Sequence, residues 1–327
     1  MPVSTLKQLR DQVLATSKQD NTQIGTFVND FINLTLQEIN SPGWAFRNER
    51  HHLWSFLKRK TTFTTTSGTS DYVMERDVDK IGIMRQTSTP AKICAVTDEQ
   101  FYKYNPNPDS QGNPLIYREW EVSGLSTRLT SADTINISSS SANDGSSFTV
   151  TVLGYVSGRL TSEVFTLNGT SSVTGSVTWD AREIFVSKSG NTTGNITVVR
   201  NTGSATLLVI GKEEVSPRFK VVSLYPIPSS TLTIHLEYYK AIRELVNDSD
   251  VPEFHQKYHY IVRLGALAKV FQFLGKTEDF NSANDVYARA IRSMVANDKS
   301  SPDLITQLER RNGSLVIPRV DLSATIS

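Results

Sequence analysis

Apolar residues recur at three- and four-residue intervals near the N-terminus of the chain. In residues 4–17 they fall on one helical face behind a Ser4 or Thr5 cap, and in residues 22–39 they form a stronger stripe. Ser41-Pro42-Gly43 ends that stripe, so the spacing predicts two amphipathic helices. Large aromatic residues follow in a short polar context and are predicted to pack helix against sheet: Trp44, Phe46, Trp54 and Phe56.

Residues 61–84 change to an alternating pattern that is typical of strands. Thr61, Phe63 and Thr65 alternate with smaller or polar neighbours, Ser67-Gly68 supplies turn chemistry, and β-prone residues resume at Tyr72. The stretch predicts a β-hairpin.

From about residue 125 the composition shifts towards Ser and Thr, which make up roughly a third of the next eighty residues, while Lys and Arg become sparser. About seven or eight strand-like runs follow one another at the spacing of a β-sandwich. Regular aromatic and branched aliphatic positions argue against a disordered tract. The region therefore predicts an immunoglobulin-like β-sandwich without a disulfide.

Beyond Lys212 two alternating runs predict strands, a polar crossing with Pro252 follows, and two apolar stripes predict helices over residues 253–274 and 278–296. The fold class predicted is α+β, a helical core with a β-hairpin extension, interrupted by an inserted immunoglobulin-like β-sandwich. The predicted parts are residues 1–123 (helices and β-hairpin), 124–212 (inserted sandwich), 213–299 (strands and two helices) and 300–327 (extended C-terminal tail).

Charge and composition exclude several classes of protein. The net charge is +1 and the isoelectric point is about 7.8, so the whole chain has no bulk attraction for nucleic acid or for an anionic membrane. No apolar run has the length of a membrane span or a signal-peptide core, and we expect folding in the cytoplasm of the producing cell. The sole cysteine, Cys94, lies in an apolar run and is predicted to be a buried small hydrophobe.

Candidate chemistry is sparse. His255 and His259 are four residues apart on a predicted helix and could face one metal ion, but the supporting ligands of a zinc site are missing. The sequence has no Gly-rich phosphate cradle and no Gly-x-Ser-x-Gly elbow. We therefore predict no catalytic residue, no metal, no cofactor and no enzymatic activity. The densest basic run, Lys58, Arg59 and Lys60, is either a DNA contact or an ordinary solvated surface.

The order of these pieces resembles the head-to-tail adaptor (connector) proteins of tailed bacteriophages. The resemblance covers about residues 20–123 and 213–299 and is carried by the helix "FVNDFINLTLQEI", the stretch "TTFTTTSGTSDY", the strand "TLTIHLEYYKAI", the acidic crossing "NDSDVPEF" and the two final helices. Family members often continue the hairpin with a Tyr-x-Leu-Pro-x-Asp turn, whereas here Glu75 replaces the Pro.

The resemblance implies a structural virion protein, assembled in the host cytoplasm, that forms a ring of typically twelve copies beneath the portal. Its implied partners are further copies of itself, the portal protein, tail or nozzle proteins and, transiently and without sequence preference, genomic DNA; no membrane is implied. An insertion at residues 124–212 would project from the ring. The chain's own candidates for subunit contact are Trp44, Trp54, Phe56 and Phe271, and those for portal binding are Leu315, Val316, Ile317 and Val320.

Two other functions stay open at this point. The sandwich could recognise a glycan or a host surface on an oligomerising helical base, which exposed aromatic residues such as Tyr155 or Trp179 would favour. A hydrolase with an accessory sandwich would instead show turnover of a polysaccharide that depends on a carboxylate.

Overall fold

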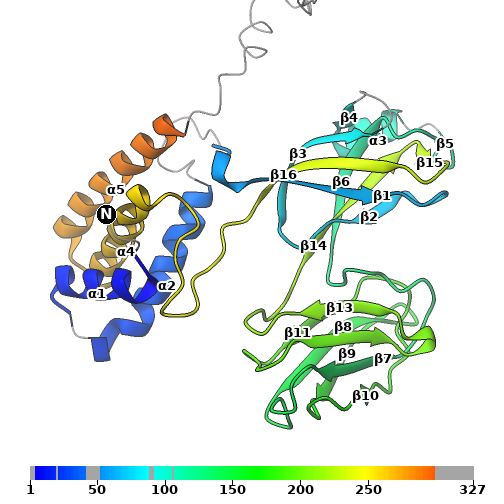
Figure 1. Cartoon of the computed structure of the whole chain (residues 1–327), viewed down its shortest axis with the longest axis horizontal. Coiled ribbons are helices and arrows are strands. Elements are labelled where there is room, and N and C mark those ends of the chain that lie inside the picture. The colour runs from blue at the N-terminus through cyan, green and yellow to red at the C-terminus, as the bar shows by residue number, and fades with distance from the viewer. Residues whose placement is uncertain (1–3, 20, 42–51, 88–91, 105–106, 299–327) are drawn as a thin grey trace, which may run out of the picture. The chain divides into compact units, whose positions relative to one another are not determined.

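A computed structural model describes residues 4–19, 21–41, 52–87, 92–104 and 107–298. The chain forms two compact units, one from residues 1–56 and 242–327 and the other from residues 57–241 (Figure 1). The first unit is helical and the second consists mostly of strands. The chain is therefore mixed α+β, as its sequence predicts.

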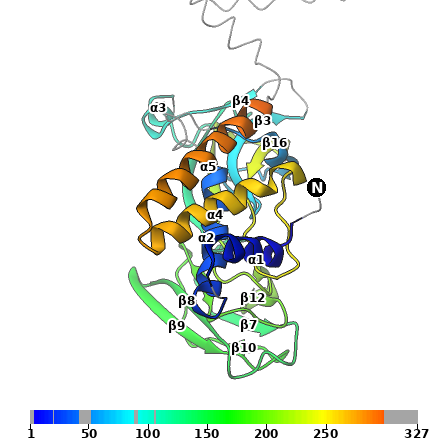
Figure 2. The same ribbon diagram turned by 90° about the vertical axis from the view of Figure 1, so that its left-hand side faces the viewer.

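The helical unit contains α1 (Leu6–Ser17), α2 (Asn21–Asn40), α4 (His259–Phe273) and α5 (Thr277–Asn297), of which α4 packs against the other three. Figure 2 shows α4 and α5 side by side. Thr5 begins α1 with a capping box, in which its hydroxyl accepts from the Gln8 amide and the Gln8 side chain accepts from the Thr5 amide. The helices predicted over residues 4–17, 22–39 and 278–296 are confirmed. The helix predicted from residue 253 begins six residues later, because His255 first caps a 3-10 turn at Gln256–Tyr258.

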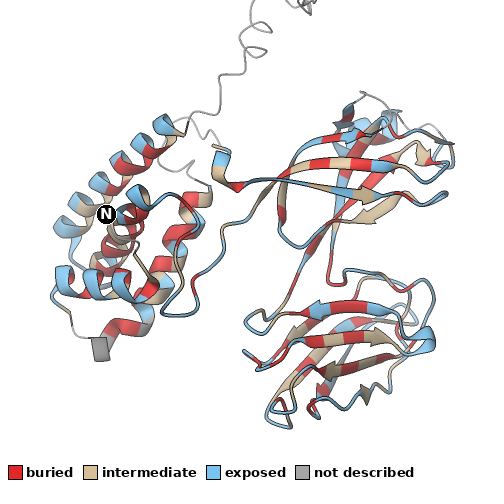
Figure 3. Cartoon of the chain, viewed as in Figure 1, coloured by how far each residue is buried: buried red, intermediate tan, exposed pale blue. Residues whose placement is uncertain are grey.

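The β-rich unit has a seven-stranded sheet in the order β1-β16-β3-β4-β6-β14-β2, in which only β4 and β6 pair in parallel. Buried side chains from this sheet form a core around Met84, Ile93, Tyr117 and Leu236. Figure 3 marks the buried positions along the strands in red. The strands are β1 (Lys58–Thr64), β2 (Asp71–Val73), β3 (Val78–Gln86), β4 (Lys92–Ala95), β6 (Ile116–Ser123), β14 (Phe219–Tyr225) and β16 (Thr233–Lys240).

The hairpin prediction for residues 61–84 is wrong in its pairing. Strands β1 and β2, both fully described, do not pair with each other, because β1 pairs with β16 and β2 pairs with β14. The turn at Gly68 is real, with a backbone φ of 77°, but its amide donates to the Pro228 carbonyl at 2.9 Å. Turn residues therefore fixed where the chain reverses, while partners far away in the sequence fixed the pairing.

Cys94 also differs from its prediction, since it is exposed. It lies on β4 next to Ile93, which is buried in the sheet core. Successive residues of a strand point to opposite faces, so the apolar run around Cys94 cannot be buried throughout.

Residues 124–212 contain two further sheets that share one buried core around Ile137, Val152, Trp179 and Val198. The four-stranded sheet has the order β10-β7-β12-β13 and the three-stranded sheet the order β11-β8-β9. Their strands are β7 (Ile135–Ser139), β8 (Thr149–Val156), β9 (Arg159–Thr166), β10 (Val173–Thr174), β11 (Phe185–Lys188), β12 (Ile196–Arg200) and β13 (Thr206–Ile210).

Smaller elements complete the β-rich unit: helix α3 (Asp98–Tyr104), the parallel pair β5 (Gln111–Gly112) and β15 (Ile227–Pro228), and a 3-10 turn at Thr202–Ser204. Among the described helices of both units, none combines the length and the apolar character that crossing a bilayer requires.

Candidate functional site

The open face of β1, β16, β3 and β4 carries a row of basic side chains. His235 on β16 lies opposite both Thr62 on β1 and Arg85 on β3, and Arg85 in turn lies opposite Lys92 on β4. Two residues away along β1 and β16, Lys60 lies opposite Glu237. Directly paired residues share a face of a sheet. The basic sheet face therefore consists of Lys58, Lys60, Lys80, Arg85, Lys92 and His235.

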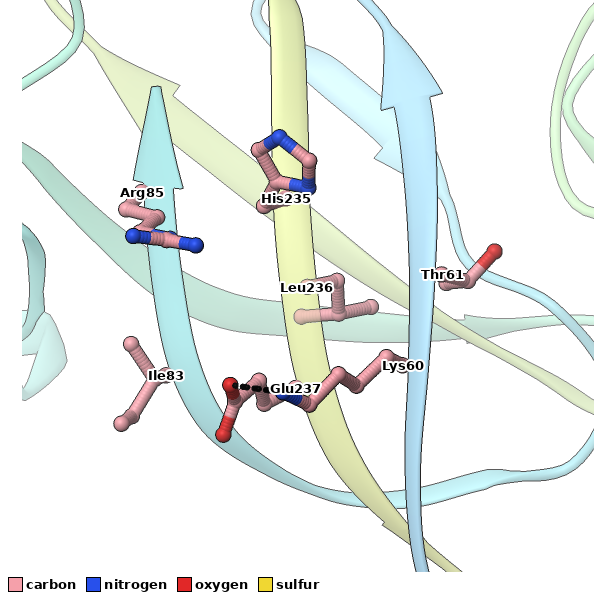
Figure 4. Close-up of a pocket in the computed structure, with 7 residues that line it drawn as sticks. All are labelled: Lys60, Thr61, Ile83, Arg85, His235, Leu236 and Glu237. Atoms are coloured by element: carbon pink, nitrogen blue, oxygen red, sulfur yellow. Dashed lines mark ion pairs between the residues drawn. The ribbon is translucent and has the colours of Figure 1, made fainter. Parts of the chain in front are cut away.

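Figure 4 shows the middle of this basic sheet face, a shallow hollow of about 40 Å³. Glu237 lies beside it and receives two ion pairs, from Lys58 Nζ at 2.9 Å and from Lys60 Nζ at 3.2 Å. The hydrogen bond from Lys58, with that from Lys60, holds the pKa of the Glu237 carboxyl below its usual range, although partial burial opposes the shift. Glu237 thus stays ionised and orients both lysines, while the Lys60 side chain remains 76 % exposed.

The structure separates the three consecutive basic residues of the sequence. Arg59 lies opposite Tyr238, whose side chain is buried in the sheet core, so Arg59 faces away from Lys58 and Lys60. The basic sheet face instead gains Arg85, Lys92 and His235 from three other strands. These residues are far apart in the sequence, and only strand register brings them together.

The described candidates for subunit contact lie largely inside the helical unit. Trp54 is 1 % exposed, and its Nε1 donates to the Ile39 carbonyl at 2.6 Å. The Trp54 ring lies 5.5 Å from that of Phe56, which lies 5.6 Å from Phe254. These rings join the chain entering α4 to the end of α2. Phe271 is half-buried, with Lys276 Nζ 5.8 Å from its ring centre.

Other aromatic residues of the helical unit are exposed. Phe27 on α2 and Phe273 on α4 are 47 % and 54 % exposed, and their rings stack at a centroid distance of 5.4 Å. The ring centres of Phe31 and Phe273 are 5.9 Å apart. Leu34, on α2 like Phe31, is 47 % exposed. We call Phe27, Phe31, Leu34 and Phe273 the aromatic patch. In the sequence, Phe27, Phe31 and Leu34 were visible only as part of the apolar stripe over residues 22–39.

The two histidines considered as metal ligands have other partners. His259 is buried, its Nδ1 accepts from the Ser4 amide at 3.3 Å, and its Nε2 lies 3.0 Å from the Phe254 carbonyl. This arrangement makes Nε2 the protonated nitrogen, and burial lowers the pKa of the ring. His255 Nδ1 accepts from the Lys257 amide at 3.2 Å. The described residues contain no group of three or more metal-ligating side chains.

Several predicted site residues lie outside the described residues. These are Trp44 and the portal-binding candidates Leu315, Val316, Ile317 and Val320.

Comparison with known proteins identifies the family of the chain. No curated protein matches the chain. The model of a family described as SU10 adaptor protein matches residues 150–313, which is half of the chain. The match runs from β8 through α5 and so includes strands of the β-rich unit as well as α4 and α5 of the helical unit. The chain therefore belongs to the SU10 adaptor protein family, a family of phage structural adaptors.

Proposed function

We propose that this phage adaptor forms an oligomeric ring that connects the portal of the head to the tail and lets DNA pass. The family match over residues 150–313 carries the proposal. A dodecamer is the ring size that the resemblance to head-to-tail connectors favours. Such a ring would be a structural component of the virion, assembled in the host cytoplasm, with portal and tail or nozzle proteins on its two sides.

The aromatic patch supports self-association. Contacts between identical subunits in a ring are heterologous, so one surface must meet a different surface on its neighbour. The exposed parts of Phe27 and Phe273 offer roughly 200 Å² of apolar surface, worth ~5 kcal/mol before the costs of ordering. We assign a second copy of the chain to this patch. Trp54 and Phe56 would support the contact from inside the unit, and Trp44 and Phe271 remain candidates for it.

The C-terminal strip Leu315, Val316, Ile317 and Val320 is proposed to bind the portal, because an extended apolar segment can add a strand or fill a groove on a partner. A chain that lacks residues 312–327 is then expected to fold and form rings but to fail to retain portal protein in a pull-down. Unchanged portal retention would contradict this assignment.

The basic sheet face is proposed to contact passing DNA weakly. Five cationic side chains and one carboxylate give it a local excess of positive charge in a chain whose net charge is only +1. Phosphate contacts of this kind carry no sequence information and weaken as salt rises. They would guide DNA without holding it. Of the two interpretations left open by the sequence for Lys58 and Lys60, the proposal takes the DNA contact, whereas Arg59 faces away from them.

The division of the chain proposed from its sequence also stands as a proposal. In it, residues 124–212 are an immunoglobulin-like β-sandwich inserted between core segments 1–123 and 213–299, with residues 300–327 as a tail. The shared core of the two smaller sheets supports the sandwich. The compact units, in contrast, divide the chain at 56/57 and 241/242 and keep both smaller sheets together with the seven-stranded sheet.

Negative-stain imaging and native mass spectrometry of the purified chain, alone and mixed with portal protein, test the proposal. We expect closed rings whose mass is an integer multiple of 36.4 kDa and which stack on portal rings. A monomer that does not bind portal would refute it.

The second candidate function is a glycan-binding module. Trp179 is fully buried and so is no longer a candidate for glycan contact, whereas Tyr155 lines a pocket described below and remains one.

A further inference from the structure

A pocket of about 430 Å³ opens in the β-rich unit where the end of β6 meets the loop before β11. This volume is typical of small-molecule sites. The lining combines two aromatic rings with four charged side chains, and its residues are Trp120, Glu121, Arg128, Tyr155, Ala181, Arg182 and Glu183.

Trp120 is held in place while much of its ring stays open. Its side chain is 45 % exposed, and the Arg118 guanidinium carbon lies 4.0 Å from the indole centre. Arg118 is itself nearly buried, because the rings of Phe101 and Tyr102 on α3 cover it at 4.3 and 4.8 Å. Arg118 therefore supports one side of Trp120 and leaves the remainder of the indole to the pocket.

A second wall of the pocket is fixed by hydrogen bonds around Asp180. Its carboxylate accepts from the amides of Ser157 and Gly158 at 3.0 and 2.9 Å, and its own amide donates to the Tyr155 carbonyl at 2.8 Å. Tyr155 is half-buried, with the Arg182 guanidinium 5.8 Å from its ring centre. The turn after β8 and the loop before β11 are thus tied together behind the pocket.

Close packing joins the two walls. A Cβ atom on Gly124 would lie 2.3 Å from the Ile184 carbonyl oxygen and 2.6 Å from Phe185 Cα. Only glycine allows this approach, which sets the segment after β6 directly against the start of β11. The spacing between Trp120 and Tyr155 is therefore built into the fold.

The charges in the pocket balance. Arg128 forms an ion pair with Glu121, and Arg182 and Glu183 add one charge of each sign. A pocket without net charge does not favour a polyanion such as nucleic acid. The carboxylate and guanidinium groups of the lining supply several acceptors and donors within one pocket, a pattern that matches neighbouring hydroxyl groups. The negative faces of Trp120 and Tyr155 match the C–H-rich face of a sugar ring.

From these observations we propose that the pocket binds a neutral saccharide. The indole of Trp120 would lie against the sugar ring, while Glu183 and Arg182 bind its hydroxyl groups. The proposal goes beyond the ring function and does not depend on it, because the pocket lies within a single chain. It would give the adaptor a recognition site for surface glycans.

Isothermal titration of the full-length protein with cellotriose, maltotriose, triacetylchitotriose and galactobiose tests the proposal. A twelve-nucleotide single-stranded DNA represents the alternative class of ligand. We expect saturable binding of at least one sugar and about tenfold weaker binding by Trp120→Ala, the size of a lost aromatic contact. Tyr104→Ala is the matched control, since Tyr104 is 58 % exposed and does not line the pocket, and it should bind like the wild type.

Glu183→Gln keeps the shape of the pocket and should also weaken sugar binding. It serves as the deciding variant if Trp120→Ala lowers the melting temperature. Binding to none of the four sugars would overturn the proposal, as would sugar binding that both pocket variants retain. DNA binding that is lost in Trp120→Ala would instead identify a nucleic-acid site. Ring formation, measured on the same samples, reports separately on the proposed function.

Discussion

Gly265 shows how one residue sets the spacing of helices. It lies inside α4, and a Cβ atom there would lie 2.4 Å from Thr35 Cγ2 on α2 and 2.8 Å from Tyr287 Cζ on α5. Replacing glycine by alanine inside a helix normally stabilises it by about 1 kcal/mol. Overpacking a close contact costs roughly 1–3 kcal/mol. We expect the second effect to dominate, so that Gly265→Ala lowers the free energy of unfolding measured by urea denaturation.

A double-mutant cycle with Thr35→Ser separates the two effects. The Thr35 hydroxyl donates to the Phe31 carbonyl at 2.7 Å, which fixes its methyl group towards α4, and serine keeps the hydroxyl while removing that methyl. The double variant should therefore be more stable than the sum of the single changes by about 1 kcal/mol. Strict additivity would show that the close approach at Gly265 does not limit packing.

The hydrogen bonds of Asp133 lead us to expect that the stability of the two smaller sheets depends on pH. Arg200 Nε donates to its carboxylate at 2.7 Å, which lowers the pKa of Asp133 from its ordinary 3.8, and Thr202 and the Thr134 amide add further hydrogen bonds. A lowered pKa in the folded state means that the ionised carboxylate contributes stability above pH 3.8, and this contribution is lost as the pH falls below that value.

Asp133→Asn places an amide donor among these donors and should lower the melting temperature at neutral pH. Because the variant lacks the titrating group, the difference in melting temperature between wild type and variant should narrow in calorimetry as the pH falls below 3.8. A difference that stays constant over this range would contradict the assignment.

At the scale of elements, the sequence predicted what depends on neighbours along the chain. The helical stripes, the cap at Thr5 and the turn at Gly68 were visible because their periodicity and turn chemistry are local. The partners of β1 and β2 were not visible, because β1 pairs with residues 233–239 and β2 with residues 221–223. The basic sheet face was missed for the same reason. Lys60 and Arg85 lie on neighbouring rows of one face only through register with β16.

The alternation of β1 makes the DNA proposal testable. Lys60→Gln combined with Arg85→Gln should weaken binding to a 30-base-pair duplex and reduce the slope of log K against log salt by about one per lost phosphate contact. Arg59→Gln removes one positive charge from the other face of β1 and should leave that slope unchanged. If Arg59→Gln reduces the slope as much as the double change does, the contact is not confined to the basic sheet face.

At the scale of the whole molecule, each compact unit has its own buried core. The β-rich unit is continuous in sequence from residue 57 to residue 241, while the helical unit is assembled from both ends of the chain. Residues 57–241 expressed alone should therefore keep a cooperative thermal transition and the blue-shifted fluorescence of the buried Trp179. Loss of both signals would show that the sheets need the helices to fold.

Assembly should depend on the helical unit, since the aromatic patch lies there. We expect Phe27→Ser combined with Phe273→Ser to abolish ring formation in native mass spectrometry. Both rings are about half exposed, so their replacement removes more surface from a subunit contact than from the core of the unit, and the helical circular dichroism signal should persist. Tyr260→Ser is the matched control, because Tyr260 lies on α4 like Phe273, is 39 % exposed and is outside the aromatic patch.

Rings formed by the double variant, or lost equally in Tyr260→Ser, would mean that the subunit contact lies elsewhere. Because ring contacts are heterologous, subunits with a disrupted patch still carry the partner surface and should cap wild-type rings when mixed with them, shifting the population towards open arcs.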